Sequence, residues 1–213
     1  MDPITAEFFS GRIQVDDRDG LLTQHLNTIE IRDLAGAPDE SLVKVRRSGR
    51  GYGVILETTS RYLALPFKVY LGGPVAGAVI QNDHVELRNE WTNKGIGVRA
   101  AALQITTARK LKVHKITATA AGSLDMSGLP SDPLRGYHIW PRLGYEAPIP
   151  SWLLPCLPSH LRGATLLSEL MADLQGQALW KSRGMGVDVW FYPQDQAFWQ
   201  RFQMYLAQRK IAL

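Results

Sequence analysis

The sequence predicts a mixed α/β domain, and three features of its middle section lead to this fold class. β-Rich runs over 52–59 and 62–71 are separated by two residues, a spacing that favours an antiparallel pair. A glycine turn then joins a strand-like run over 85–90 to a helix-like run over 100–112, which contains neither proline nor glycine. A strand over 115–120 follows, and this strand–helix–strand order favours a parallel pair.

Local patterns predict the elements that precede the glycine turn. Residues 5–9 suggest a short helix. Polar and apolar residues alternate over 27–32, which predicts a first strand. Residues 44–50 are rich in lysine and arginine and are expected to form a loop. Residues 75–80 predict a further strand, which precedes the one over 85–90.

Helical spacing dominates the C-terminal part of the chain. Residues 135–140 predict a short helix that is ended or bent by the proline that follows. Leucines recur at three- and four-residue spacing within 159–183, which predicts a helix divided at Gly176. Residues 187–192 read as a strand. A final amphipathic helix is expected over 194–209, with its aromatic stripe in the core.

The composition fits a globular protein without a membrane segment. Apolar residues make up 45% of the chain and charged residues 21%, and no run reaches about 18 apolar residues. The first residues lack the basic-then-apolar order of a secretory signal, and the single cysteine, Cys156, excludes an internal disulfide. We therefore expect a cytoplasmic protein. The histidines fall in no ligand spacing, so no metal site is expected.

The net charge of +4 is compatible with an anionic ligand or with nucleic acid. Basic residues gather over 44–50 and over 109–115. The second group falls at the end of the expected helix, where cations interact favourably with the helix dipole. Nucleic acid therefore stays open as a partner through Lys44 to Arg50.

The glycine turn is the strongest candidate for a binding site, and it reads Trp91-Thr92-Asn93-Lys94-Gly95-Ile96-Gly97-Val98-Arg99. A helix N-terminus leaves several backbone N–H groups unpaired, and glycines let an anion approach them closely. Together with the helix dipole this predicts a phosphate cradle, to which Lys94 and Arg99 add positive charge. The same pattern also fits a tight turn that packs the helix onto the sheet.

Two classes of phosphate ligand are disfavoured because the sequence lacks the residues that their binding motifs require. No Gly-Lys-Ser/Thr ends the loop, which argues against a Walker site. No acidic residue occurs over 112–120 to hold a ribose, which argues against a dinucleotide. A different phosphate ligand is therefore favoured.

The order of the elements and two short motifs resemble the GNAT superfamily of N-acetyltransferases. The pyrophosphate motif of that superfamily is Gln/Arg-x-x-Gly-x-Gly/Ala, and residues 92–97 match it at Gly95 and Gly97. A later signature consists of an aromatic residue, three further residues and Gly-Phe. Residues 140–145 follow that form, from Trp140 to Tyr145.

This resemblance implies a mixed, mostly antiparallel sheet with a splayed central pair of parallel strands, flanked by helices. It implies one domain over 1–213, with its core at about 28–150 and 187–192. A helical insertion would occupy about 151–186 and a C-terminal helix about 194–210.

The resemblance also implies the ligand. The segment from Lys94 to Arg99, with the backbone of Gly95, Ile96, Gly97 and Val98 at its centre, would hold the pyrophosphate of coenzyme A. Acetyl-CoA would be the cosubstrate, and an amine on a small molecule or a protein would be the acceptor. The reaction would be direct attack of that amine on the thioester.

Three departures from the family motifs bear on catalysis. Thr92 stands where glutamine or arginine is usual, and Trp140 stands where a tyrosine usually protonates the leaving thiolate. Ala121-Gly122-Ser123 replaces an asparagine that is often found after the parallel strand. Tyr137 lies one helical turn before Trp140 and is the candidate to replace it as the acid.

The candidates for the general base lie before the glycine turn. Glu86 and Glu90 would share one face of a regular strand, and His84 lies beside them. His138 is a further group that titrates near neutral pH. The departures from the motifs leave a second hypothesis open, in which a GNAT-like module binds coenzyme A or another partner without turnover.

Overall fold

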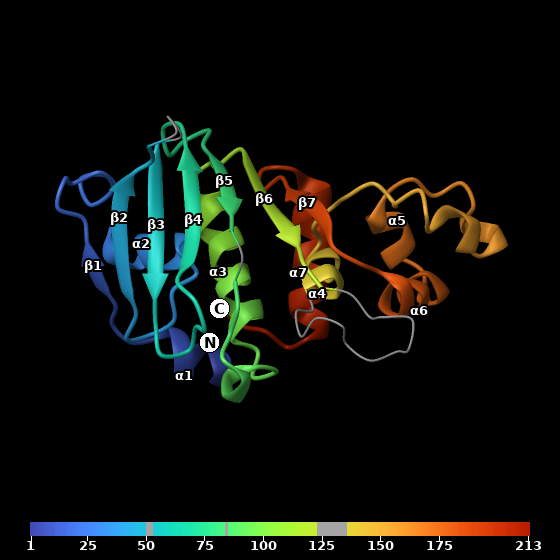
Figure 1. The fold of residues 1–213 in the computed structure, drawn as a ribbon, viewed down its shortest axis with the longest axis horizontal. Helices are drawn as coiled ribbons and strands as arrows, with labels where there is room; N and C mark the ends of the chain where they lie inside the picture. The colour runs from blue at the N-terminus through green and yellow to red at the C-terminus, as the bar shows by residue number, and fades with distance from the viewer. Residues whose placement is uncertain (50–52, 84, 123–135) are drawn as a thin grey trace.

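The computed structural model describes residues 1–49, 53–83, 85–122 and 136–213. In this part of the chain, strands and helices form a mixed α/β structure around one seven-stranded sheet (Figure 1). The strands lie across the sheet in sequence order: β1 (Gln14–Asp16), β2 (Leu42–Arg47), β3 (Val54–Thr59), β4 (Phe67–Gly72), β5 (Val79–Asn82), β6 (Lys115–Ala120) and β7 (Val187–Phe191). The α-helices are α1 (Pro3–Phe9), α2 (Thr28–Leu34), α3 (Ile96–Lys110), α4 (Gly136–Arg142), α5 (Leu167–Met171), α6 (Leu174–Arg183) and α7 (Gln196–Gln208). The mixed fold class predicted from the sequence is confirmed.

Two parallel pairs interrupt an otherwise antiparallel sheet. β1 lies parallel to β2 and β5 lies parallel to β6, while the other neighbouring strands are antiparallel. Helix α3 connects the parallel strands β5 and β6. The strand predicted over 85–90 is wrong: this segment contains a single bridge at Leu87 and the start of a 3-10 helix, so the parallel partner of β6 is β5. The predictions of an antiparallel β3–β4 pair and of strand β6 are confirmed.

The sheet buries one face under helices. Inward-pointing side chains alternate with outward-pointing ones along each strand, and most of the inward ones are fully buried. Buried positions on successive strands are Val43, Leu56, Val69, Ile80, Ile116 and Val189. Figure 1 shows α2 and α3 behind the sheet and no helix in front of β2 to β5. The described part of the fold therefore leaves this other face of the sheet uncovered.

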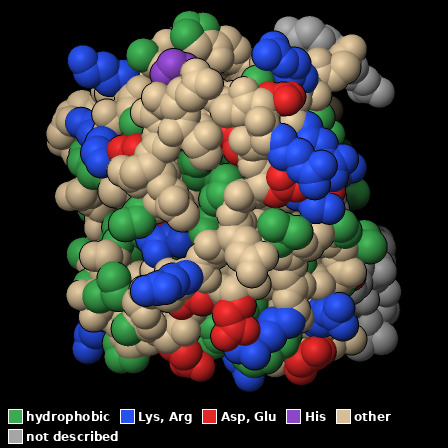
Figure 2. All heavy atoms as spheres, turned by 90° about the vertical axis from the view of Figure 1, so that its left-hand side faces the viewer, with side chains coloured by type: hydrophobic (Ala, Val, Ile, Leu, Met, Phe, Trp, Pro, Cys, Tyr) green, Lys and Arg blue, Asp and Glu red, His purple; other side chains and the backbone are tan. Residues whose placement is uncertain are grey.

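The basic residues expected in a loop over 44–50 begin in strand β2, so that prediction is wrong. Val43 and Val45 point into the core while Lys44 and Arg46 alternate with them, and β2 pairs with β3 along its whole length. The loop was predicted from the density of lysine and arginine, although apolar and basic residues alternate along this segment as they do in a strand. Beside β2 the surface is hollowed into a shallow pocket of about 470 Å³, and Figure 2 shows Lys and Arg side chains beside Asp and Glu on this side.

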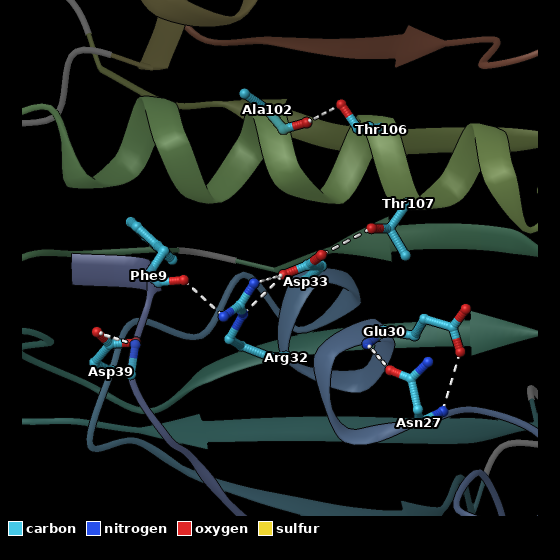
Figure 3. Close-up of polar contacts among 10 residues, drawn as sticks. Phe9, Asn27, Glu30, Arg32, Asp33, Asp39, Ala102, Thr106 and Thr107 are labelled. Atoms are coloured by element: carbon cyan, nitrogen blue, oxygen red, sulfur yellow. Dashed lines mark hydrogen bonds and ion pairs between the residues drawn. The ribbon is translucent and has the colours of Figure 1, made fainter. Parts of the chain in front are cut away.

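The strand predicted over 27–32 is also wrong, because these residues begin helix α2. Asn27 and Glu30 form a capping box (Figure 3). The Asn27 side chain accepts from the Glu30 N–H at 2.9 Å, and the Glu30 carboxylate accepts from the Asn27 N–H at 3.0 Å. This reciprocal pair starts a helix by satisfying two otherwise unpaired donors, and it overrides the alternation of apolar residues.

A buried ion pair ties the first three helices together (Figure 3). Arg32 on α2 contacts the neighbouring Asp33 carboxylate at 2.8 Å and donates to the Phe9 carbonyl of α1 at 2.6 Å. Asp33 also accepts from the Thr107 hydroxyl of α3 at 3.0 Å. Burial raises the pKa of Asp33, an effect that Arg32 and Thr107 oppose. The side chains of α2 thus fix α3, which begins at the glycine turn.

The single helix predicted over 159–183 is replaced by two helices, α5 and α6. The break lies at Ala172 and Asp173 rather than at Gly176. Asp173 accepts from the N–H groups of the next turn and begins α6. Gly176 lies inside α6, where an added Cβ would collide with the Leu170 carbonyl. A glycine there reflects close packing of the two helices and not a helix end.

The remaining C-terminal predictions are confirmed. Helix α4 contains Pro141 in its last turn, strand β7 ends at Phe191, and α7 lies within the predicted range. Phe202 and Tyr205 of α7 are buried, as their spacing predicted. Helices α5 and α6 lie beyond β7, at the far end of the sheet from β1 (Figure 1).

Candidate functional site

The two central parallel strands separate partway along their length. β5 and β6 pair only as far as Asn82 and Ala118. From there β6 continues to Ala120 beside β7. The chain after β5 instead turns toward the segment before β4, where Leu87 forms an antiparallel bridge with Leu63. The two central strands therefore have different partners beyond this point, which opens the sheet between them.

A buried amide pair fixes the point of separation. The Asn82 side chain donates to Gln104 Oε1 at 2.7 Å and accepts from Gln104 Nε2 at 2.9 Å. Gln104 Nε2 also donates to the Leu34 carbonyl at 2.7 Å. Because Gln104 belongs to α3, this network holds the helix against the end of β5. Buried amides satisfied in this way hold their elements in one arrangement.

The turn that follows uses two residues in the left-handed region. Asn93 has φ 60° and Gly95 has φ 81°. A short 3-10 helix, η1 (Asn89–Trp91), precedes them where the end of a strand was predicted. Glycine adopts positive φ without steric cost, and asparagine tolerates it better than most residues do. The turn aims the start of α3 back along the sheet.

The first N–H groups of α3 have no hydrogen-bond partner in the described part of the chain. Among the described residues, no hydrogen bond engages the N–H groups of Ile96, Gly97 or Val98, and the first helical bond runs from the Arg99 N–H to the Gly95 carbonyl at 3.1 Å. A Cβ built on Gly97 would meet no atom within 4 Å. Unpaired N–H groups at the positive end of a helix dipole suit an anion, and the open space at the Cβ position of Gly97 leaves room for one beside that residue.

The side chains of Ile96 and Lys94 have separate roles: the first packs in the interior, and the second lies at the surface. Ile96 is 2% exposed and packs with Phe8 and Tyr62 in a small apolar cluster beside α1. The Lys94 ammonium lies 4.4 Å from the centre of the Trp91 ring, and the residue is exposed. Ile96 thus anchors the turn, whereas Lys94 lies at the surface beside it with a charge that an anion can use.

Arg99, predicted to bind the phosphate, is directed elsewhere. Its side chain is buried and its guanidinium donates to the Asp2 carboxylate at 3.1 Å. Asp2 also accepts from the backbone N–H groups of Ile4 and Thr5 and from the Thr5 hydroxyl. Arg99 therefore supports the turn and binds a carboxylate of the chain itself, while its buried Nε has no hydrogen-bond partner among the described residues.

The ends of the chain meet at this carboxylate. The Asp2 N–H donates to the Ala212 carbonyl at 2.7 Å, and the Ala212 N–H donates to Asp2 Oδ2 at 3.2 Å. Burial by itself would raise the pKa of Asp2, but the hydrogen bonds from Thr5 and the guanidinium of Arg99 lower it to about 2. Asp2 is therefore ionised and pairs with Arg99 at neutral pH.

We expect Gly95→Ala to destabilise the fold by about 1–3 kcal/mol, since a left-handed residue with a Cβ is strained. The added Cβ would also lie 2.7 Å from Arg99 Nη1, at the pair with Asp2. Gly73→Ala is the matched control, because Gly73 has φ 85° but open space around it. Urea unfolding should show a larger loss for the Gly95 variant. Equal losses would mean that the contact with Arg99 costs nothing.

Glu86 and Glu90, the candidate bases, lie on the segment that leaves β5. They line one side of a shallow pocket of about 280 Å³ together with Ala64, Leu87, Arg88 and Asn89. Glu90 belongs to η1, so the expectation that both carboxylates share one face of a regular strand is wrong. The pocket still brings both to one place. His84 lies outside the described residues.

Tyr137, the candidate acid, is a buried residue of α4. Its hydroxyl donates to the Lys181 carbonyl of α6 at 3.1 Å, and its own carbonyl accepts from the Trp180 indole at 2.8 Å. Trp140 packs edge-on against Tyr145 with ring centres 4.8 Å apart. Tyr145 is fully buried, its hydroxyl has no hydrogen-bond partner among the described residues, and burial raises its pKa. In this arrangement the Tyr137 hydroxyl joins α4 to α6.

Sequence reasoning missed Asp2 as part of the site, as well as the amide pair of Asn82 and Gln104. Asp2 before Pro3 is a helix-start signal, since proline is favoured at the first helical position. Nothing local, however, connects Asp2 with Arg99, which is distant in the sequence. The amide pair likewise joins residues from separate elements. Such contacts become visible only when the fold is known.

Comparison of the sequence with models of protein families and with curated proteins gives no match. Among the described residues, no helix is both long and apolar enough to cross a membrane. No group of three His, Cys, Asp or Glu side chains that could hold a metal occurs within 1–49, 53–83, 85–122 and 136–213.

Proposed function

We propose that this protein is a divergent GNAT-like acyltransferase that transfers an acyl group, most simply acetyl, from acyl-CoA to an amine. The observation that carries the proposal is the combination of diverging central strands with unpaired N–H groups at the start of α3. A sheet that opens beside a helix N-terminus offers an extended coenzyme both a slot and a diphosphate anchor. Two motif glycines form that anchor, at Gly95 and Gly97.

The diphosphate would lie against the N–H groups of Ile96, Gly97 and Val98. Charge-assisted hydrogen bonds from backbone N–H groups are short and strong, and the helix dipole adds to them. Lys94 is exposed next to the turn and can approach a phosphate without losing other hydrogen bonds. Arg99 contributes indirectly, because it holds the turn and does not reach the ligand. Of the residues predicted to bind the coenzyme, Lys94 and the backbone of residues 96–98 would contact it, and Arg99 would only hold the turn in place.

The acyl transfer needs a positioned amine and a base. The amine nitrogen attacks the thioester carbonyl, a C–N bond forms, and the C–S bond breaks to release the coenzyme thiolate. The amine proton passes to a base, for which Glu86 and Glu90 are the candidates on the pocket of the β5 side. The thiolate takes its proton from water, because the Tyr137 hydroxyl already donates to a carbonyl.

A second candidate function is a module that binds coenzyme A without turnover. The buried Tyr137 hydroxyl and its bond to Lys181 favour it, since no tyrosine of α4 is then left to act as the acid. The two candidates share the binding site and differ in the chemistry that follows.

Two measurements test these candidates in order. Titration calorimetry with acetyl-CoA should give saturable binding with a dissociation constant below about 1 mM. Thiol release from acetyl-CoA is then followed with a panel of primary amines. Product formation that falls on Glu86→Gln or Glu90→Gln supports the transferase. Binding without product supports the module, and absence of binding at millimolar coenzyme refutes both.

A further inference from the structure

Six residues form a straight row across the uncovered face of the sheet. The strand registers place them opposite one another, from Arg46 on β2 through Ile55, Tyr70, Gln81 and Thr117 to Trp190 on β7. All of them point away from the helices, because they alternate with the buried positions of their strands. We call this row and its neighbours the open sheet face.

Aromatic rings stand at two places on this face. Tyr70 is partly exposed on β4, and Trp190 is partly exposed on β7. Three strand spacings separate them, which corresponds to roughly 14 Å. The Lys115 ammonium lies 5.8 Å from the Trp190 ring and 5.5 Å from the Tyr192 ring, so a cation accompanies the second aromatic group.

Two carboxylates of this face form polar contacts, whereas three of its lysines form no ion pair within the described residues. Glu57 pairs with Arg46 at 3.4 Å, and Asp188 accepts from the Thr119 hydroxyl at 2.8 Å. In the described part of the chain, no ion pair is formed by Lys44 on β2, Lys68 on β4 or Lys115 on β6. Within the strands, the open sheet face carries the cations Lys44, Arg46, Lys68 and Lys115 and the carboxylates Asp16, Glu57 and Asp188, which leaves a small excess of positive charge.

We propose that the open sheet face binds a single-stranded nucleic acid. Bases stack on aromatic side chains exposed on a sheet, and lysines along the same surface neutralise the phosphates. A flat sheet suits a single strand, whose bases can be turned toward it, better than a double helix. Trp190 and Tyr70 supply the stacking positions, and Lys44, Lys68 and Lys115 supply the phosphate contacts along the row.

This inference is independent of the proposed acyl transfer. The row lies on the outward side of the strands, whereas the N–H groups at the start of α3 belong to the helix layer behind them. Neither the aromatic residues nor the three lysines take part in the amide cradle. An acidic peptide would satisfy the lysines but would leave the two aromatic groups without a role, so nucleic acid fits the whole face better.

The test measures fluorescence anisotropy of labelled 12-residue oligo(U) and oligo(dT) with the full chain. We expect dissociation constants of about 10⁻⁴–10⁻⁶ M, with affinity that falls as salt rises. Trp190→Leu should weaken binding at least about fivefold through lost stacking. Exchange of Lys44, Lys68 and Lys115 for alanine should reduce the slope of log K against log salt by about 2. Comparison of the two oligonucleotides decides between RNA and DNA.

Matched controls lie away from the open sheet face. Trp152→Leu changes a tryptophan that is 42% exposed in the segment before α5, and Lys181→Ala changes an exposed lysine of α6. Neither variant should alter binding, and all variants should retain the wild-type melting temperature to within a few degrees. The proposal is overturned if neither oligonucleotide binds at low salt. It is equally overturned if Trp190→Leu leaves the affinity unchanged, or if polyglutamate binds as tightly as the oligonucleotides.

Discussion

Gly97→Glu is expected to raise the dissociation constant for acetyl-CoA at least about 30-fold. The space in front of Gly97 is open, so a glutamate side chain fits without distorting the helix. Its carboxylate would then occupy the place of the diphosphate and repel it. Two like charges about 4 Å apart interact by a few kcal/mol near a protein surface, and about 2 kcal/mol already corresponds to 30-fold.

The same substitution is expected to leave the fold intact, so that a loss of binding reports on the binding site. Gly97 lies in the first turn of α3 and does not have a positive φ. An acidic residue in that turn interacts favourably with the helix dipole. The variant should therefore unfold at the same urea concentration as the wild type or at a higher one, so lost binding cannot be attributed to lost structure.

Gly97→Ala is the matched control for this experiment. Alanine has no charge and would meet no atom within 4 Å, and it stabilises a helix relative to glycine by up to about 1 kcal/mol. Calorimetry should show coenzyme binding close to that of the wild type. If the glutamate variant binds acetyl-CoA within threefold of the wild type, the diphosphate does not lie on these N–H groups.

The sequence predicted those elements whose periodicity matches their burial. Strand β6 and helix α7 show clear alternation or helical spacing, because each turns one regular apolar side to the core. Residues 27–32 alternate in the same way, yet they begin a helix because the capping box at Asn27 decides the local structure. The hydrophobic periodicity therefore predicts the wrong element where a helix-capping motif favours a different local structure.

The candidate site was predictable as far as it is local. Gly95 and Gly97 are separated by one residue in the sequence, and a turn leading into a helix follows from their pattern. Arg99 could be placed near the turn but not oriented, because its direction depends on Asp2 at the start of the chain. The uncovered sheet face was equally hidden, since its row of residues is assembled from six strands.

Asp2→Ala is expected to destabilise the fold by about 3–5 kcal/mol, since removing one partner leaves the other charge buried and unpaired. Arg99 is 9% exposed and would lose its carboxylate, while the start of α1 and the Ala212 N–H would lose an acceptor. Urea unfolding at neutral pH measures this loss. Arg18→Ala is the control, because the Arg18 side chain in the Arg18–Asp16 ion pair is 88% exposed. Loss of this surface pair should cost less than about 1 kcal/mol.

Two further measurements, one in acid and one with a second substitution, test whether Asp2 stabilises the fold through its charge or through packing. The pKa of Asp2 is lowered to about 2, so its stabilisation is complete above the usual carboxyl value of about 4 and is lost as the pH falls toward 2. The stability gap between wild type and Asp2→Ala should therefore shrink over that interval. Adding Arg99→Met to Asp2→Ala should recover part of the loss, because it removes the unpaired buried charge. A gap that stays constant down to pH 2, with no recovery in the double variant, would show that Asp2 acts through its packing and not through its charge.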